Sequence, residues 1–311
     1  MASRPTFSIV MPAYNASATI GSAISSVLAQ THPSFELIVV DDGSTDDTAE
    51  KVRPFEADGR VWMLRQRNSG LPASRNEAIG RARGDLISML DSDDLWLPTY
   101  LEAMKATLER DSQAGFAYTD AWILEDASKR VYKATAMEHQ EPPATPPDDP
   151  ELLLRELLSR NFVFTSVTAR REALDRVGPF DLRLQAAEDY ELWLRLAAYG
   201  YRAARPPGTL ALYRMREGSV SRDELLMTKS LCRVFRIVTE EYRLSGENRR
   251  LAQMRLRELE AALTQDGSNL SRRYRLRAWL IRRKLALLGD RLFFRTPPAE
   301  LTAAFPDLGA P

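Results

Sequence analysis

Cysteine and long apolar runs are scarce in this sequence of 311 residues, and each scarcity excludes a class of protein. The one cysteine, Cys232, excludes an intrachain disulfide framework and a cysteine zinc cluster, and it fits a reducing compartment. Its apolar neighbours Leu231 and Val234 favour a buried structural thiol. No window approaches the roughly 18 uninterrupted apolar residues of a membrane span, and the start lacks the pattern of a signal peptide. We therefore expect a cytoplasmic protein with at most peripheral contact with the inner face of the cell membrane.

An excess of one charge sign is also absent, because 43 Lys and Arg residues balance 43 Asp and Glu residues. This balance argues against a uniformly basic surface, so we expect no nucleic-acid partner. The sum conceals a division, since the chain from Asp223 onward holds 17 basic and 11 acidic residues and the rest has the opposite excess. We predict two parts, a domain over residues 1–222 and a basic, α-helical C-terminal extension over residues 223–311.

Strand and helix signals alternate over the first hundred residues. Apolar runs of strand length follow segments whose apolar residues recur at helical spacing, with short connections between them. This pattern predicts an α/β fold with a mostly parallel sheet and helices on both faces. The expected strands are Phe7–Met11, Phe35–Val40, Val61–Leu64 and Leu86–Leu90, and the expected helices are Ser17–Ala29, Leu71–Ala82 and Pro98–Arg110.

The segment from Glu138 to Pro150 interrupts this pattern, because it contains five prolines and no apolar periodicity. It predicts an exposed extended loop over residues 138–150, either a plain linker or a mobile lid or acceptor loop. Other expected elements are one or two strands within Gly115–Leu124, helices Glu151–Ser159 and Ala187–Tyr199, and strands Ser166–Ala169 and Thr209–Met215. Beyond Met215 we expect helix almost to the end of the chain.

Three of the expected strands end in polar clusters, which are PAYN from Pro12, Asp41-Asp42, and Asp91-Ser92-Asp93. Ligands of open α/β sheets bind at the carboxyl ends of the strands. A single acidic turn after a strand more often serves capping and solvation than ligand binding, so the prediction of a site depends on the three clusters together. Alternation points the side chains of Asp91 and Asp93 to the same side, where two carboxylates suit Mg or Mn. No G-x-G-x-x-G follows the first strand, which disfavours dinucleotide binding.

Four motifs occur in a fixed order between residues 6 and 220, namely VMPAYN, VVDDGSTDDT, NSGLPASRNEAIGRARGDLISMLDSDD and AEDYELWLRL. In this order they resemble the family 2 inverting glycosyltransferases of GT-A fold. The resemblance implies a Rossmann-like, nucleotide-binding sheet, and the predicted C-terminal helical extension lies beyond the stretch that it covers. It also implies a nucleotide-sugar donor, usually a UDP-sugar, and a glycan or lipid-linked acceptor.

The resemblance further implies a nucleotide site. The turn of Pro12, Ala13, Tyr14 and Asn15 would lie along the nucleoside, and Asp42 would accept a hydrogen bond from the base. Gly70 would permit close backbone approach, and Arg75 would be the cation near the nucleotide. Asn68 and Asn76 match the same stretch, although helix caps and turns use asparagine equally well.

The resemblance also implies a metal site and a catalytic base. Asp91 and Asp93, with Ser92 between them, match the metal-diphosphate motif, and Asp93 is the better candidate for direct ligation of Mn or Mg. Inversion is a single in-line displacement that needs one base on the acceptor hydroxyl. In the family this base is a carboxylate at the start of a helix, where Glu188 and Asp189 stand, and we assign it to Asp189. The alternative is that both acids only stabilise the helix N-terminus.

Two departures from the family pattern modify these expectations. Arg216 stands where the family often has a histidine, and an arginine cannot ligate a metal but can pair with phosphate oxygens. Metal dependence is therefore less secure than the Asp pair suggests. The Q-x-x-R-W motif of processive synthases is absent, so we expect a single-addition transferase in cell-surface glycan biosynthesis. The alternative from another class is a catalytically silent nucleotide-sugar-binding or scaffold protein.

The segment Leu270–Arg295 contains nine basic residues and one acidic residue. On a helix its apolar residues form two stripes with basic residues between them, whereas a membrane-surface helix has one wide apolar face. We expect it to pack on the catalytic part or on a second copy in a homodimer. Peripheral contact with an anionic membrane near a lipid-linked acceptor is the alternative.

Overall fold

A seven-stranded sheet forms the centre of the protein in the computed structural model, which describes residues 4–264 and 294–305 apart from 128, 133–134, 139–142, 144, 164–165 and 217–218. The strand order is β10-β6-β9-β4-β1-β2-β3. Every neighbouring pair is parallel except the two pairs that β9 makes with β4 and β6, so the predicted mostly parallel sheet is confirmed. The strands are β1 (Phe7–Ala13), β2 (Phe35–Asp41), β3 (Val61–Arg65), β4 (Leu86–Met89), β6 (Ala114–Tyr118), β9 (Val167–Arg170) and β10 (Arg202–Ala204).

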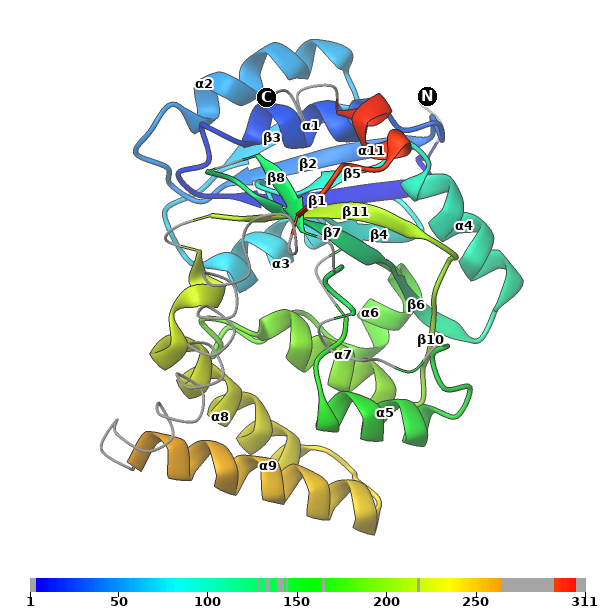
Figure 1. Cartoon of the computed structure of the whole chain (residues 1–311), viewed down its shortest axis with the longest axis vertical. Helices are drawn as coiled ribbons and strands as arrows, with labels where there is room; N and C mark the ends of the chain where they lie inside the picture. The colour runs from blue at the N-terminus through cyan, green and yellow to red at the C-terminus, as the bar shows by residue number, and fades with distance from the viewer. Residues whose placement is uncertain are drawn as a thin grey trace.

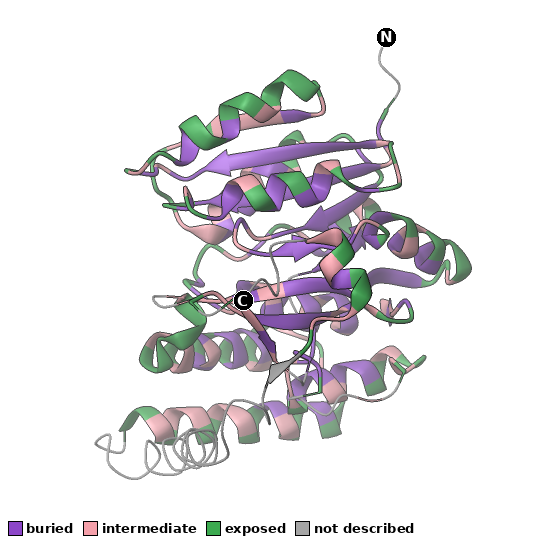
Figure 2. Ribbon diagram, turned by 45° about the horizontal axis from the view of Figure 1, so that its top comes forward, coloured by how far each residue is buried: buried purple, intermediate pink, exposed green. Residues whose placement is uncertain are grey.

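The central strands bury both of their faces, which explains why their sequences are mostly apolar. Successive side chains of a strand point to opposite faces, so Val10 and Ile38 enter one core while Ile9 and Leu37 enter the other. Figure 2 shows these strands buried between helices whose outward faces are exposed. The first core includes α3 (Leu71–Arg81), α5 (Pro150–Ser159), α6 (Arg171–Val177) and α7 (Glu188–Ala198), and the second includes α1 (Ile20–Leu28), α2 (Thr48–Val52) and α4 (Tyr100–Arg110).

A smaller five-stranded sheet has the order β12-β8-β7-β11-β5. It contains β5 (Leu95–Trp96), β7 (Asp120–Glu125), β8 (Arg130–Tyr132), β11 (Thr209–Met215) and β12 (Phe294–Arg295). The final described helix, α11 (Ala299–Ala304), contributes the fully buried Leu301 to a cluster with Leu124 and Leu212 of this sheet. In Figure 1 the red C-terminal segment therefore lies beside the strands of this sheet, far from the end of α9.

Two long helices, α8 (Glu224–Glu241) and α9 (Gly246–Thr264), follow the second sheet. They pack on each other, α8 also packs on α7, and α9 packs on α5, so they lie on the opposite side of the molecule from α1 and α2 (Figure 1). Asn248 of α9 is fully buried, and its Nδ2 donates to Oε2 of Glu151 at 2.8 Å. Cys232 of α8 is buried, which confirms the structural thiol. Short 3-10 helices occur at Arg53–Asp58 and Val220–Arg222.

Most predicted elements are present, with ends that differ by a few residues. The expectation of helix almost to the end is wrong at Phe294–Arg295, because this segment pairs with β8 as a strand. The remainder of the basic segment Leu270–Arg295 lies outside the described residues. So do residues 139–142 and 144 of the predicted 138–150 loop. Of its described residues, Pro150 begins α5 and the others form neither helix nor strand. The division into residues 1–222 and 223–311 stays a prediction. Among the described helices, none has the length and apolarity that crossing a membrane requires.

Candidate active site

The carboxyl ends of β1, β2 and β4 meet at one edge of the large sheet, because these strands are parallel and adjacent. Ala13 and Asp41 are register partners at this edge, and the backbone N–H of Asp42 donates to the carbonyl of Ala13 at 2.8 Å. Asp91 follows β4 two residues after Met89. The structure thus brings together the three polar clusters that the sequence singled out.

The turn after β1 is attached to the turn after β2 by its asparagine. The backbone N–H of Asn15 donates to Oγ of Ser44 at 2.9 Å, and Oδ1 of Asn15 accepts from the backbone N–H of Thr45 at 2.9 Å. Asn15 has φ 49°, in the left-handed region that asparagine tolerates better than most residues. Pro12 and Ala13 are the last residues of β1, whereas Tyr14 is 49% exposed at the edge. An exposed aromatic ring next to a rigid turn is suited to cover the flat face of a nucleoside.

Asp42 is buried and anchors the loop that leads into α3. Its Oδ1 accepts from Nε2 of Gln66 at 2.7 Å and from the backbone N–H of Ser69 at 2.9 Å, and its Oδ2 accepts from the backbone N–H of Gly70 at 2.8 Å. Gly70 precedes α3 with φ 90°, a conformation that explains the need for glycine there. The side chain of Asn68 is exposed on the same loop. Asp42 therefore shapes this loop, and its contact with the base stays a prediction.

Arg75 is 1% exposed, although arginine is seldom buried. Its Nη2 donates to Oδ1 of Asp91 at 2.7 Å, and its Nη1 donates to Oε1 of Glu188. Burial lowers the pKa of Arg75, but the carboxylates of Asp91, Glu188 and Asp189 outweigh this effect and raise it, so the guanidinium stays charged. One buried cation thus joins the end of β4, α3 and the start of α7. Its predicted contact with the nucleotide stays a prediction, because both terminal nitrogens are engaged within the protein.

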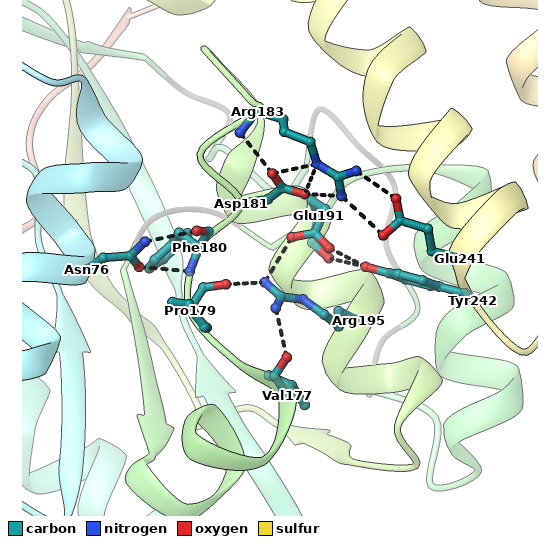
Figure 3. A network of polar contacts seen from close by, with 10 residues as sticks. All are labelled: Asn76, Val177, Pro179, Phe180, Asp181, Arg183, Glu191, Arg195, Glu241 and Tyr242. Atoms are coloured by element: carbon teal, nitrogen blue, oxygen red, sulfur yellow. Dashed lines mark hydrogen bonds and ion pairs between the residues drawn. The ribbon is translucent and has the colours of Figure 1, made fainter.

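Asn76, the neighbour of Arg75, has a structural role in the described residues. Its Nδ2 donates to the carbonyl of Phe180 at 2.9 Å, and its Oδ1 accepts from the backbone N–H of Phe180 at 2.8 Å (Figure 3). The ring of Phe180 in turn lies 5.3 Å from the guanidinium carbon of Arg75. Asn76 therefore fixes the chain between α6 and α7, which the sequence alone left open.

Asp91 and Asp93 each lie within an ion pair, and each pair uses one carboxylate oxygen. Arg75 takes Oδ1 of Asp91, and Nε of Arg216 lies 2.8 Å from Oδ2 of Asp93. Burial and the charge of Asp91 raise the pKa of Asp93. Magnesium-type cations are held by one or two carboxylates together with substrate phosphates, and the second oxygen of each Asp fits this arrangement. Across the described part of the chain, no three His, Cys, Asp or Glu side chains gather around one point as a metal site.

Strand β11 fixes the turn that carries Asp91, Ser92 and Asp93. The backbone N–H of Arg214 donates to Oδ1 of Asp94 at 3.0 Å, and its Nε donates to the carbonyl of Asp93 at 2.8 Å. Ser92 is 7% exposed within this turn. Sequence reasoning missed Asp94 and Arg214 as partners, although Asp94 stands inside one of the motifs that it quoted.

The start of α7 carries two carboxylates in different environments. Ala187 precedes the helix with φ 57°, which costs an alanine about 1 kcal/mol, so the surrounding contacts must hold it. Glu188 is 2% exposed and neutralised by Arg75. Asp189 is partly buried, and its Oδ1 accepts from the backbone N–H of Tyr190 at 2.6 Å. Burial and the charge of Glu188 raise the pKa of Asp189 to about 7, against the opposing effect of Arg75. Asp189 can therefore gain or lose a proton near neutral pH.

This arrangement defines a class of protein: an α/β enzyme with an acidic pair, paired cations and a titratable carboxylate at the carboxyl edge of its sheet. The sequence profile described as "Glycosyl transferase family 2" matches residues 8–177. The chain belongs to this family, it has the GT-A fold, and it is a glycosyltransferase.

Curated relatives agree with this assignment. The chain is 34% identical over 218 residues, 69% of its length and 79% of the relative's, to the Escherichia coli "UDP-Glc:alpha-D-GlcNAc-diphosphoundecaprenol beta-1,3-glucosyltransferase WfgD". It is 30% identical over 237 residues, 75% of its length and 88% of the relative's, to the "Putative teichuronic acid biosynthesis glycosyltransferase TuaG" of Bacillus subtilis.

Solved structures share the fold at low sequence identity. One is S. aureus TarS 1-349 in complex with UDP-GlcNAc, with a TM-score of 0.64, 20% identity and coverage of 85% of this chain and 74% of that one. Another is the mannosyltransferase PcManGT from Pyrobaculum calidifontis in complex with GDP-Man and Mn²⁺, with a TM-score of 0.61, 20% identity and coverage of 93% and 82%.

Proposed function

We propose that this glycosyltransferase inverts the anomeric centre as it moves one sugar from a UDP-sugar to a hydroxyl of a lipid-linked glycan in bacterial surface-polysaccharide synthesis. The observation that carries the proposal is the pairing of Glu188, neutralised by Arg75, with Asp189, whose raised pKa lies at about 7. One carboxylate is thereby kept for structure and the other for proton transfer, and a general base works best when its pKa lies near the working pH.

The reaction needs one base and one stabilised leaving group. The carboxylate of Asp189 takes the proton of the acceptor hydroxyl while that oxygen forms a bond to the anomeric carbon. The bond from the anomeric carbon to the donor phosphate breaks on the opposite face, and the nucleoside diphosphate leaves with the electron pair. Because this happens in one displacement, the configuration of the sugar is inverted.

Charge on the leaving diphosphate needs a cation at the carboxyl end of β4. Asp91 and Asp93 would hold a divalent cation, Mn or Mg, which would neutralise phosphate charge when bound. Arg216 already lies beside Asp93 and would pair with phosphate oxygens directly. Tyr14 would cover the nucleoside, and the loop of Asn68 and Gly70, shaped by Asp42, would line the base.

The relatives support the donor and acceptor classes. The name of the Escherichia coli relative gives UDP-Glc as donor and a diphosphoundecaprenol-linked sugar as acceptor, and the name of the Bacillus subtilis relative gives teichuronic acid biosynthesis. TarS was solved with UDP-GlcNAc. A lipid-linked acceptor would bring the enzyme to the inner face of the membrane. Contact with that membrane, or a homodimer, through the C-terminal helices remains a prediction.

Transfer is tested with a panel of UDP-sugars and a short-chain diphosphate-lipid sugar acceptor, with Mn, with Mg and with EDTA. We expect product of inverted configuration, and we expect Asp189→Asn to lower kcat by at least about 100-fold, the range attributed to general bases. Nucleotide affinity, measured by calorimetry with UDP, should stay within twofold because the base contacts the acceptor.

The matched control is Asp85→Asn at the amino end of β4, where the side chain is 70% exposed. It makes the same Asp-to-Asn change far from the carboxyl ends of the strands, so it should leave kcat unchanged. Turnover retained by Asp189→Asn would remove Asp189 from the role of base. Product of retained configuration would contradict the single-displacement mechanism.

A further inference from the structure

Tyr242, the residue that follows α8, contacts a buried carboxylate of the helix that carries the proposed base. Its hydroxyl donates to Oε1 of Glu191, which is 2% exposed. Nη2 of Arg195, one turn further along α7, donates to Oε2 of the same carboxylate at 3.0 Å. The backbone N–H of Glu191 in turn donates to the carbonyl of Ala187 at 3.1 Å, the residue that opens the helix with positive φ. Glu191 thus links the end of α8 to the start of α7.

Arg195 continues this linkage into the segment between α6 and α7. Its Nη1 donates to the carbonyl of Val177 at 2.8 Å, and its Nη2 donates to the carbonyl of Pro179 at 2.8 Å. Phe180 follows, clamped by Asn76 and lying under the guanidinium of Arg75. Figure 3 shows this network between α7, α8 and α3. Contacts therefore run without a gap from Tyr242 to the cation that neutralises Glu188 and Asp91.

A second connection on the same side is exposed and weaker. Arg183 pairs with Asp181 of the segment and, at 2.7 Å, with Oε1 of Glu241 at the end of α8. All three groups reach solvent, and exposed pairs contribute little. The triad of Tyr242, Glu191 and Arg195 is the connection that fixes geometry, because the carboxylate of Glu191 is buried and must keep its two partly buried partners.

We propose that Tyr242 is a positioning residue for transfer: through Glu191 and Arg195 it holds the start of α7, and with it Asp189, in register with Arg75. This rests on the proposed role of Asp189 as the base. All three residues lie beyond the 8–177 stretch that defines the family match. The helical hairpin of α8 and α9 is then part of the catalytic unit.

Tyr242→Phe tests this, because it removes one hydroxyl and leaves the ring in place. Displacing a base by a fraction of an ångström slows the chemical step without weakening donor binding. We expect kcat to fall about 10-fold while the donor KM and UDP affinity stay within twofold. Glu191→Gln should likewise lower kcat and leave the donor KM and UDP affinity unchanged. The double variant should have a kcat no lower than that of the more impaired single variant, because both substitutions act on one connection. A variant that is only less stable would also show a lower apparent kcat, because part of the protein would be unfolded, and two such losses would add in the double variant. Circular dichroism melting is therefore measured for each variant.

The matched control is Arg236→Ala, which breaks the exposed pair of α8 with Glu260 and should change neither constant. If folded Tyr242→Phe keeps the wild-type kcat, the positioning role is refuted. If Tyr242→Phe melts below the assay temperature, Glu191→Gln tests the proposal by the same criterion, a lower kcat with an unchanged donor KM. A wild-type protein without transfer would instead refute the proposed function, so the two failures are distinguishable.

Discussion

At the scale of single residues, the pKa of Asp189 links activity to pH. Burial and Glu188 raise this pKa to about 7, and only the ionised carboxylate can accept the acceptor proton. We expect kcat/KM to rise with pH up to about 7 and to level off above it, because kcat/KM reports the free enzyme. The measurement is initial rate from pH 5 to 9 at limiting donor concentration. A profile that is flat between pH 5 and 7 would contradict the assignment.

The same shift has a consequence for stability. Between the ordinary value of 3.8 and about 7, the folded protein retains a proton on Asp189 that the unfolded chain has lost. The unfolded state therefore binds fewer protons, and this residue's contribution to stability falls as pH rises through that window. Asp189→Asn should accordingly raise the melting temperature relative to wild type, and by more at pH 8 than at pH 5.

The motifs predicted which side chains lie at the site, but not which carboxylate pairs with which cation. The strand-end pattern placed Asp91 and Asp93 at this edge, the family resemblance added Arg75 and Asp189, and the structure brings the four together. Neither the pattern nor the resemblance indicated that Glu188 neutralises Arg75, because the two residues are 113 positions apart and no local pattern joins them. The hydrogen bonds that occupy Asp42 were missed for a similar reason, since backbone N–H donors have no signature in a sequence.

At the scale of elements, the turn after β2 depends on Gly43. Its φ is 77°, and a Cβ would lie 2.8 Å from the backbone nitrogen of Asn68. Gly43→Ala should therefore lower the free energy of unfolding by about 1–3 kcal/mol, because both the backbone angle and the contact are unfavourable. Chemical denaturation measures the change.

Gly80→Ala is the matched control on α3, where a Cβ would meet no atom within 4 Å. It should stabilise the protein by about 0.5–1 kcal/mol, because alanine favours helix and restricts the unfolded chain. Equal effects at the two positions would mean that the turn is not rigid.

Strands buried on both faces were predictable, and short strands were not. The apolar runs of β1, β2 and β4 indicated their positions because both faces are covered. β1 nonetheless continues through Pro12, since β4 pairs only with Phe7–Val10 and leaves that side of the later residues free of a neighbouring strand. β5, β8 and β10 have two or three residues each, too few for any periodicity. Their pairing depends on contacts made across the fold.

At the scale of the whole molecule, the described segment 294–305 completes the second sheet, because β12 pairs with β8 and α11 packs on its strands. Leu301 is fully buried against Leu124 and Leu212. Leu301→Ala should cost about 2–5 kcal/mol of unfolding free energy, the range for a buried leucine. The control is Leu263→Ala at the end of α9, which is 38% exposed and should change stability by no more than about 0.5 kcal/mol. If Leu301→Ala lowered the unfolding free energy no more than Leu263→Ala does, this contact would not be what holds α11.

The pair of Arg75 and Glu188 also sets the order of events during synthesis. Arg75 leaves the ribosome 16 residues before Asp91 but 113 residues before Glu188, so for much of synthesis the nascent chain holds an arginine that lacks its second carboxylate partner. Pairs distant in sequence form late in folding. Return of transfer activity during refolding should therefore lag the return of helical signal, and it would mark the arrival of α7 rather than the collapse of the first strands.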